Sequence, residues 1–290
     1  MPSYRTTSLF HYTKTANNLF NILKSGKLIP NYCEEDLSSE FTIDFVWGIP
    51  MVCFCDIPIL LAGDFLKNYG RYCVAFDKEW GKHKGCNPVQ YVTNTKILLS
   101  VEHFISRITE LLKYEEKYGV IELSETRGRF PESYLEKYKS FSRSLKLLNN
   151  LYLSDNKAYD NESKLYYLGF LKKYESEWMG KPYENYKENE WRYIIEETKS
   201  IKWLDKDEYK KWRGEVPSPK PQPSTALKRN SLKFEPTDIH HIILFEESEI
   251  PAFIRKIRTL KKIGDTVLDD DTKDILISKI SSFERIKKDY

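Results

Sequence analysis

Two side chains in this sequence combine reactive chemistry with a position at the end or on the face of a predicted strand. The first is His11, which closes a short apolar run and is followed by Thr13 at the mouth of a predicted helix. A neutral imidazole offers one hydrogen-bond donor and one acceptor, which suits a sugar hydroxyl or an amide. The alternative is a structural histidine whose ring is satisfied by neighbouring protein groups.

The second side chain is Glu190, in the segment KENEWRY. Alternating side chains of a strand face opposite ways, which predicts Glu188, Glu190 and Arg192 on one face. Trp191 and Tyr193 then face the other way, toward a core. A carboxylate held in a cleft can stabilise positive charge on a ribose carbon or accept a proton from a ribose hydroxyl. The alternative is an exposed strand with solvated acids that pair with the arginine.

No common phosphate-binding or hydrolase motif accompanies these residues. The sequence contains no GxGxxG, no Walker loop, no HExxH and no GxSxG. Its five cysteines lie in the first third of the chain, and Cys53 and Cys55 share one face of a predicted strand with Met51. An odd number argues against a disulfide framework, and a zinc site needs a second pair of ligands. We therefore expect buried free thiols and no metal.

The first hundred residues are predicted to be rich in strands. After a first short strand comes a helix that Thr13 or Thr15 can cap and that Gly26 ends. Further strands are expected in IPMVCFCDIPI, bounded by Pro50 and Pro58, in YGRYCVAFD and in NPVQYV.

The rest of the chain changes between helical and extended patterns. From about 101 to 180, charged runs with apolar residues three and four apart, such as YYLGFLKKYESEWMG, predict an inserted block of amphipathic helices. The strand period returns in KENEWRYIIEE. A proline-rich loop is expected at 214–226, a strand at 241–245 and a helical tail from about 248 to 290. Strict alternation of strands and helices is missing, which favours an α+β fold over a doubly wound sheet.

Composition narrows the class of protein. The 290 residues include 46 Lys and Arg against 43 Asp and Glu, a formal net charge of +3. This balance excludes a strongly basic nucleic-acid-binding protein of the histone type. No apolar run approaches the roughly 18 to 20 residues that cross a bilayer, and the sequence opens with no signal-like segment. We expect a soluble, cytoplasmic protein that does not enter a membrane.

Several segments, taken in order, resemble a known family. Those similar to the AbiGi family of abortive phage-resistance proteins are LFHYTKTANNLFNILKSGKLIP, GIPMVCFCDIPI, YGRYCVAFDKEWG, NPVQYV, ENEWRY and LKFEPTDIHHIIL. They cover most of the chain outside the helical insertion and the last helices. More distantly, the HYT strand end, the CF-containing strand and the late ExEWR strand resemble the ADP-ribosyltransferase superfamily, which includes DarT-like enzymes and poly(ADP-ribose) polymerases.

The superfamily resemblance implies a fold and an NAD site. The fold would be a single ADP-ribosyltransferase-like domain over 1–290, with a split antiparallel β-sheet, a helical insertion and C-terminal helices. His11, with Tyr12 and Thr13 beside it, would hold a ribose of NAD, and Glu190 would stabilise an oxocarbenium-like transition state. An aromatic side chain would stack on nicotinamide, and the candidates are Tyr69, then Tyr72 and Tyr91. A cation would bind the phosphates, and the candidates are Arg71 and Arg192.

Two functions follow from the resemblance. One is a phage-defence transferase that moves ADP-ribose from NAD to a nucleic acid or a protein, with His11 and Glu190 as its catalytic residues. The other is a non-catalytic antitoxin or sensor that binds a cognate partner protein or a nucleic acid, because the family carries an antitoxin label. No serine-threonine-serine motif occurs where VCFCDIP stands, which disfavours the arginine-serine-glutamate class of transferases.

Overall fold

The computed structural model describes most of the chain outside one long segment. The described residues are 6–37, 46–62, 69–93, 166–178, 181–196, 198–214 and 221–289. The chain divides into two compact units, residues 1–94 with 167–290 and residues 95–166. The part of the predicted helical insertion from 101 to 165 lies outside the described residues, and the single domain over 1–290 stays a prediction.

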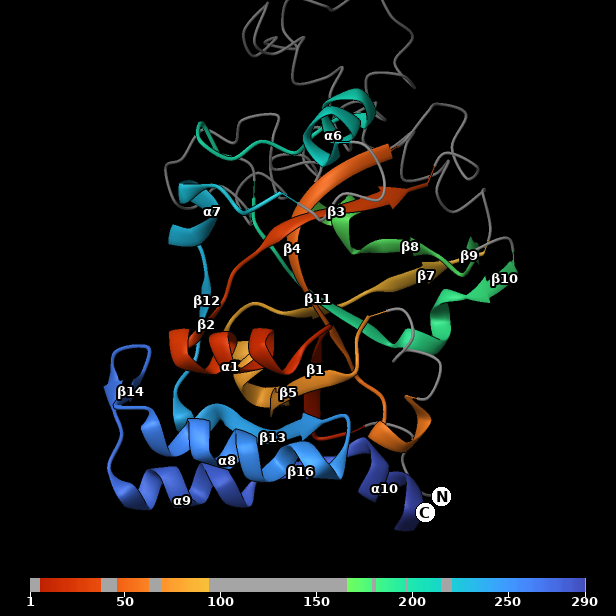
Figure 1. Ribbon diagram of the computed structural model, residues 1–290. Coiled ribbons are helices and arrows are strands. Elements are labelled where there is room, and N and C mark those ends of the chain that lie inside the picture. The colour runs from red at the N-terminus through yellow and green to blue at the C-terminus, as the bar shows by residue number, and fades with distance from the viewer. Residues whose placement is uncertain are drawn as a thin grey trace, which may run out of the picture. The chain divides into compact units, whose positions relative to one another are not determined.

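An eight-stranded sheet forms the centre of the first unit (Figure 1). Its order is β16-β13-β5-β1-β4-β11-β6, with β3 paired to β4, and every pairing is antiparallel except that of β13 with β16. The strands are β1 (Ser8–Thr13), β3 (Asn31–Asp36), β4 (Val46–Cys55), β5 (Tyr72–Asp77), β6 (Asn87–Pro88), β11 (Glu190–Ile194), β13 (Ile239–Leu244) and β16 (Ile280–Ser282). The predicted α+β class with a mostly antiparallel sheet is confirmed.

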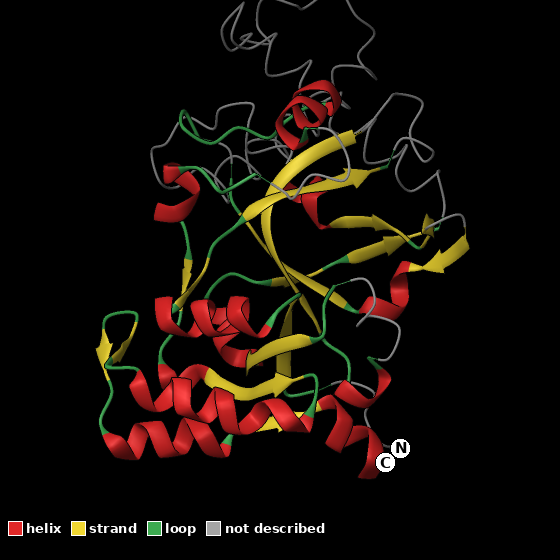
Figure 2. Cartoon of the chain, in the orientation of Figure 1, coloured by secondary structure: helices red, strands yellow, loops and turns green. Residues whose placement is uncertain are grey.

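The ladder between β1 and β4 is very short. β1 pairs with β5 along its whole length, but in the described part of the chain it pairs with β4 only where Phe10 meets Cys55. β4 continues its own ladders with β3 and β11. The strands therefore fall into two groups that meet at β1 and β4, with β4 as the long curved strand of Figure 2.

Helix α1 (Ala16–Ser25) forms as the sequence predicts. The Thr15 side chain caps it by accepting a hydrogen bond from the Asn18 N–H, and Gly26 ends it with a left-handed φ of 61°. Leu19 and Leu23 are buried in the core beneath it.

The C-terminal part of the chain is largely helical, as predicted. Its helices are α8 (Ile250–Thr259), α9 (Asp270–Ser278) and α10 (Phe283–Asp289). The sequence did not predict the ribbon of β14 (Lys262–Ile263) and β15 (Thr266–Val267), or the strand β16. Three helices elsewhere were also not predicted: α3 (Lys78–His83), α6 (Lys206–Arg213) and α7 (Thr225–Arg229). The predicted loop at 214–226 is irregular at 221–223 but ends inside α7, which Ser224 caps.

Two hydrophobic cores lie on opposite faces of the sheet. The first includes Leu9 and Phe76 and is covered by α1, α8 and α9. The short pair of β2 (Lys27–Leu28) and β12 (Leu232–Lys233) adds Leu28 and Leu232 to it. The second includes Phe10 and Ala75 and is closed by Phe283 of α10. Neighbouring residues of β1 thus contribute to different cores, which is the alternation expected of a strand.

The predicted amphipathic helix in YYLGFLKKYESEWMG is wrong. A 3-10 turn at Tyr166–Phe170 leads into β8 (Leu171–Lys173), and β9 (Glu175–Trp178) pairs with β10 (Lys181–Glu184) as a hairpin. β8 lies parallel to β7 (Gln90–Val92), so a partner distant in sequence supplies the backbone hydrogen bonds that a helix would have made locally.

Two strand boundaries also differ from expectation. β4 begins at Val46, so Pro50 lies inside the strand, where its carbonyl accepts a hydrogen bond from the Ile195 N–H. The segment NPVQYV forms two short strands, β6 on the central sheet and β7 beside β8.

Candidate functional site

The side chains of β11 face two ways, as their alternation predicts. Trp191 and Tyr193 pack against the first core. Glu190 and Arg192 lie on the other face, opposite the two cysteines of β4, and are 6% and 0% exposed. The alternative of an exposed strand with solvated acids is therefore wrong, because neighbouring strands and turns cover this face.

Hydrogen-bond acceptors surround the guanidinium of Arg192. Its Nε donates to Glu190 Oε1 at 2.8 Å, and its Nη2 lies 3.1 Å from Glu190 Oε2. Nη2 also donates to Glu35 Oε1 at 2.5 Å, and Nη1 donates to the Gly169 carbonyl at 2.5 Å. Hydrogen bonds between charged groups are the strong ones, so Arg192 ties β11 to β3 and to the turn before β8.

A second cation, Lys172 of β8, approaches the same carboxylate from another side. Its Nζ lies 2.7 Å from Glu188 Oε2 and 2.8 Å from Glu190 Oε2. The Tyr69 hydroxyl donates to the other oxygen of Glu188 at 2.7 Å, and the Tyr91 hydroxyl accepts from the Glu190 N–H at 2.8 Å. Together with the contacts of the guanidinium, these define a buried charge network that consists of Glu35, Lys172, Glu188, Glu190 and Arg192.

Glu188 joins this network from a turn and not from the predicted strand. Residues Asn185–Glu188 form a 3-10 turn, and Asn189 has a left-handed φ of 40° before β11 begins at Glu190. The prediction that Glu188 belongs to the strand is wrong, since this turn interrupts the extended chain. The turn nevertheless returns its buried carboxylate to Lys172.

Burial and charge shift the pKa values of the network in different directions. Burial alone raises the pKa of Glu190, but Arg192 and Lys172 hold it well below its usual range. For Glu35, burial outweighs the opposing charge of Arg192 and raises the pKa to about 7. Burial lowers the pKa of Lys172, yet Glu190 and Glu188 together raise it. At neutral pH the network therefore holds an ionised Glu190 between two cations, with Glu35 near its titration midpoint.

His11 lies where β1 and β4 stop pairing. Its Nδ1 donates to the backbone carbonyl of Cys53 at 2.9 Å, and its ring packs edge-to-face against Phe54 at 5.8 Å between centroids. Burial lowers the pKa of His11, so the ring is neutral at pH 7. The imidazole thus supplies one hydrogen bond to β4 at the point where the backbone ladder ends.

The structure does not bring His11 and Glu190 together. Phe10 and Glu190 are both Cα partners of Cys55, so their side chains lie on its face of the sheet. His11 follows Phe10 and points the other way, against Phe54. Within the described part of the chain, no hydrogen bond or ion pair joins the two predicted catalytic residues.

The other predicted binding residues are scattered. Tyr12 is buried, and among the described residues its hydroxyl has no hydrogen-bond partner. Thr13 ends β1 opposite Tyr72, whose hydroxyl donates to a glutamate of the C-terminal part of the chain. Arg71 is exposed, with its guanidinium carbon 4.5 Å from the centre of the Phe245 ring.

Several of the predicted NAD-binding residues are engaged by other groups of the protein. Arg192 has no exposed surface to offer a diphosphate. The Tyr69 hydroxyl is engaged by Glu188, although part of that side chain reaches the surface. His11 was expected to hold a ribose of NAD and Glu190 to stabilise the transition state, and the two side chains extend from opposite faces of the sheet.

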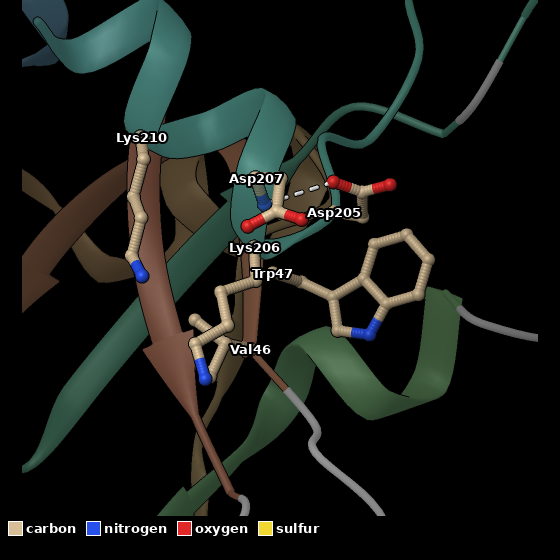
Figure 3. A pocket seen from close by; sticks show the side chains of 6 residues that line it. All are labelled: Val46, Trp47, Asp205, Lys206, Asp207 and Lys210. Atoms are coloured by element: carbon tan, nitrogen blue, oxygen red, sulfur yellow. Dashed lines mark hydrogen bonds between the residues drawn. The ribbon is translucent and has the colours of Figure 1, made fainter.

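A surface pocket of about 400 Å³ lies elsewhere, between the start of β4 and the start of α6 (Figure 3). Its lining is mixed in charge and consists of Val46, Trp47, Asp205, Lys206, Asp207 and Lys210. Asp205 caps α6 and accepts from the N–H groups of Asp207 and Glu208, so the helix end is already satisfied by its own chain. None of the predicted site residues lines this pocket.

Comparison with known proteins assigns the family. Residues 26–245 match the family described as abortive phage resistance protein AbiGi, antitoxin. The chain belongs to the AbiGi family. The Abortive phage resistance protein AbiGi of Lactococcus lactis subsp. cremoris is 28% identical over 279 residues, which cover 90% of this chain and 99% of that protein. No solved structure matches.

The AbiGi match includes every member of the buried charge network and begins after the strand that holds His11. In the described residues of this AbiGi protein, no helix has both the length and the apolar composition needed to cross a bilayer. Those residues also contain no group of three or more His, Cys, Asp or Glu side chains placed to hold a metal ion.

Two members of the network in this AbiGi protein were not predicted. Lys172 lies in the segment expected to be helical, so its strand partners could not be foreseen. Glu35 is flanked by exposed acids, but Cys33 and Leu37 lie two positions away on either side. This period of two, with less polar residues on both sides, was a signal that Glu35 faces inward.

Proposed function

We propose that this AbiGi protein is a non-catalytic antitoxin that binds a cognate toxin protein in a two-component abortive-infection system. The observation that carries the proposal is the match of residues 26–245 to a family described as an antitoxin. Similarity along nearly the whole chain to a protein named for abortive phage resistance supports the same setting.

The geometry of Glu190 agrees better with this role than with catalysis. Both of its carboxylate oxygens accept hydrogen bonds from cations, and its side chain is buried. A network that joins β3, β8, β11 and the turn at Asn185–Glu188 stabilises a scaffold, and a scaffold suits recognition of a partner. A fold can retain the architecture of an enzyme family and serve as a binding module.

Co-expression with the protein encoded by the neighbouring gene tests this function. We expect that protein to arrest growth alone, this chain to relieve the arrest, and the two to co-purify. The variants His11→Gln and Arg71→Ala, which alter predicted NAD-binding residues, should relieve the arrest as well as the wild type does. Loss of relief in a variant whose melting temperature is unchanged would overturn the non-catalytic proposal.

ADP-ribosyl transfer is the second candidate. It is supported by the order of His11 and Glu190 along the chain and by the narrow junction of β1 and β4, beside which His11 lies. Incubation of the full chain with adenylate-labelled NAD and host or phage lysate tests it. Labelled product or released nicotinamide that disappears in a folded Glu190→Gln variant would support transfer, and the absence of both in the wild type would exclude it.

A further inference from the structure

The end of α1, the β2–β12 pair, the end of α8 and the β14–β15 ribbon meet at one edge of the first unit (Figure 1), and these segments carry several basic residues. The Gly264 N–H donates to the Lys24 carbonyl at 3.4 Å, and Gly264 lies against Gly26, so the ribbon touches the end of α1. We call this surface the basic edge; it consists of Lys24, Lys27, Lys233, Lys261 and Lys262.

Most charges of the basic edge have no counterion within the described part of the protein. Lys233 lies 3.7 Å from Asp265, and both of these side chains are largely exposed. The other four make no ion pair with any described residue: Lys24, Lys27, Lys261 and Lys262. Two carboxylates lie at the same edge: Asp265, and Glu235, which accepts a hydrogen bond from the Thr266 hydroxyl. Five cations against two carboxylates still create a local positive field that the net charge of +3 does not show.

One contact within the basic edge works against folding. Lys27 of β2 and Lys233 of β12 are direct Cα partners in an antiparallel pair. Like charges placed opposite each other across two strands destabilise the pair. This pairing therefore adds positive charge to the edge without adding stability to the two strands.

An exposed apolar side chain lies beside these lysines. Val267 of β15 is the Cα partner of Lys262 and is 79% exposed, the highest value among the large hydrophobic residues of the described chain that lie at the surface. Three exposed aspartates follow directly, at the start of α9: Asp269, Asp270 and Asp271. A nucleic-acid backbone that extended along this edge would meet their negative charge. A protein surface can match positive, apolar and negative areas in turn.

We propose that the basic edge is the docking surface for an acidic patch on the partner protein, with Val267 as the apolar contact at its border. The inference rests on the proposed function, since the partner is the toxin that this chain binds. Opposite charges on the two proteins would steer their encounter and fix their orientation, and the apolar side chain beside the charged area would be buried in the contact.

A pair of matched double variants of the full chain tests the proposal. Lys27→Glu with Lys262→Glu reverses two charges on the basic edge. Lys210→Glu with Lys211→Glu reverses two exposed charges on α6, which lies apart from that edge (Figure 1). Isothermal titration against the protein encoded by the neighbouring gene should show about tenfold weaker binding or more for the first double variant and no change for the second.

The first double variant also carries its own folding control. The Lys27→Glu substitution places a carboxylate opposite Lys233, so the melting temperature of this variant should equal or exceed that of the wild type. Weaker binding in this well-folded chain supports the docking surface.

Three other outcomes count against the proposal. Binding equal to the wild type overturns the docking surface and leaves the antitoxin function standing, whereas absence of binding and of growth relief by the wild type overturns both. Binding of a DNA duplex that only the first double variant loses, with protein binding retained, assigns the edge to nucleic acid and also overturns the proposal.

Discussion

The guanidinium of Arg192 holds the carboxylate of Glu190 through two hydrogen bonds, 2.8 Å and 3.1 Å long. The two residues are separated by one position on β11, so they extend from the same face of the strand and are buried together. A carboxylate in this setting is a structural anchor. Its availability to a ligand depends on the loss of contacts that also support the fold.

Replacing Arg192 with methionine is expected to lower the free energy of unfolding by about 3–5 kcal/mol, because Glu35 would stay buried without its cation and Glu190 would keep only Lys172. Urea denaturation at pH 7, followed by tryptophan fluorescence, measures the change. A variant with the same free energy of unfolding as the wild type would show that the network contributes little to stability.

The double variant Arg192→Met with Glu190→Gln separates a paired contribution from simple loss of packing. Removing both charges should cost less than the sum of the two single changes, by a coupling of about 0.5–3 kcal/mol. Strict additivity in the same urea experiment would contradict a direct ion pair between these residues.

Glu35 predicts a pH dependence of stability. Burial raises the pKa of Glu35 from an ordinary value of 4.5 to about 7 in the folded chain. Between these values the folded chain binds more protons than the unfolded chain, so the contribution of Glu35 is full below about pH 4.5 and is lost as the pH rises through about 7. The stability of the wild type relative to Glu35→Gln should therefore fall from about pH 5 to about pH 8. A difference that is constant with pH would exclude this titration.

The close approach of Gly26 to Gly264 predicts a large effect of one added methyl group. A Cβ at Gly26 would lie 2.5 Å from the Gly264 nitrogen, on a backbone with φ of +61°. Gly85 is the matched control, because its φ of +82° is equally unusual but a Cβ there would meet open space. Gly26→Ala should cost about 1–3 kcal/mol more than Gly85→Ala in the same denaturation experiment. Equal losses would mean that the contact between α1 and the β14–β15 ribbon is looser than described.

The buried hydroxyl of Tyr12 predicts a substitution that does not destabilise. This hydroxyl has no partner among the described residues, whereas the Tyr72 hydroxyl donates to Glu249 at 2.7 Å. Tyr12→Phe should leave the free energy of unfolding unchanged or raise it by about 1 kcal/mol, and Tyr72→Phe should lower it by about 1 kcal/mol. A loss in Tyr12→Phe would reveal a partner for the hydroxyl.

Local signals in the sequence were enough to predict the helices and strands that depend mainly on local interactions. Helix α1 begins at a capping residue, Thr15, and ends at Gly26, and both are visible in the sequence. The alternation along β11 correctly predicted that Trp191 and Tyr193 face the core while Glu190 and Arg192 face the other side. The α+β class followed from the order of such elements.

The residues that surround Glu190 could not be found in the same way. Lys172 reaches it from a strand that forms only because β7 lies beside β8, and Glu35 reaches the same guanidinium from β3. The predicted pairing of His11 with Glu190 depended on which face of the sheet each residue occupies. That relation is set by the single β1–β4 contact at Phe10 and Cys55, which no local pattern encodes.

The position of β5 between β1 and β13 also has a consequence for synthesis of the chain. When β5 has left the ribosome, the strand that completes its second edge has not been made, and residues 78–238 must be translated first. At typical translation rates this takes on the order of ten seconds. During that interval the unpaired edge of β5 is a template for pairing with other chains. The sheet therefore closes only late in translation, once β13 has been made, however fast its earlier strands pair.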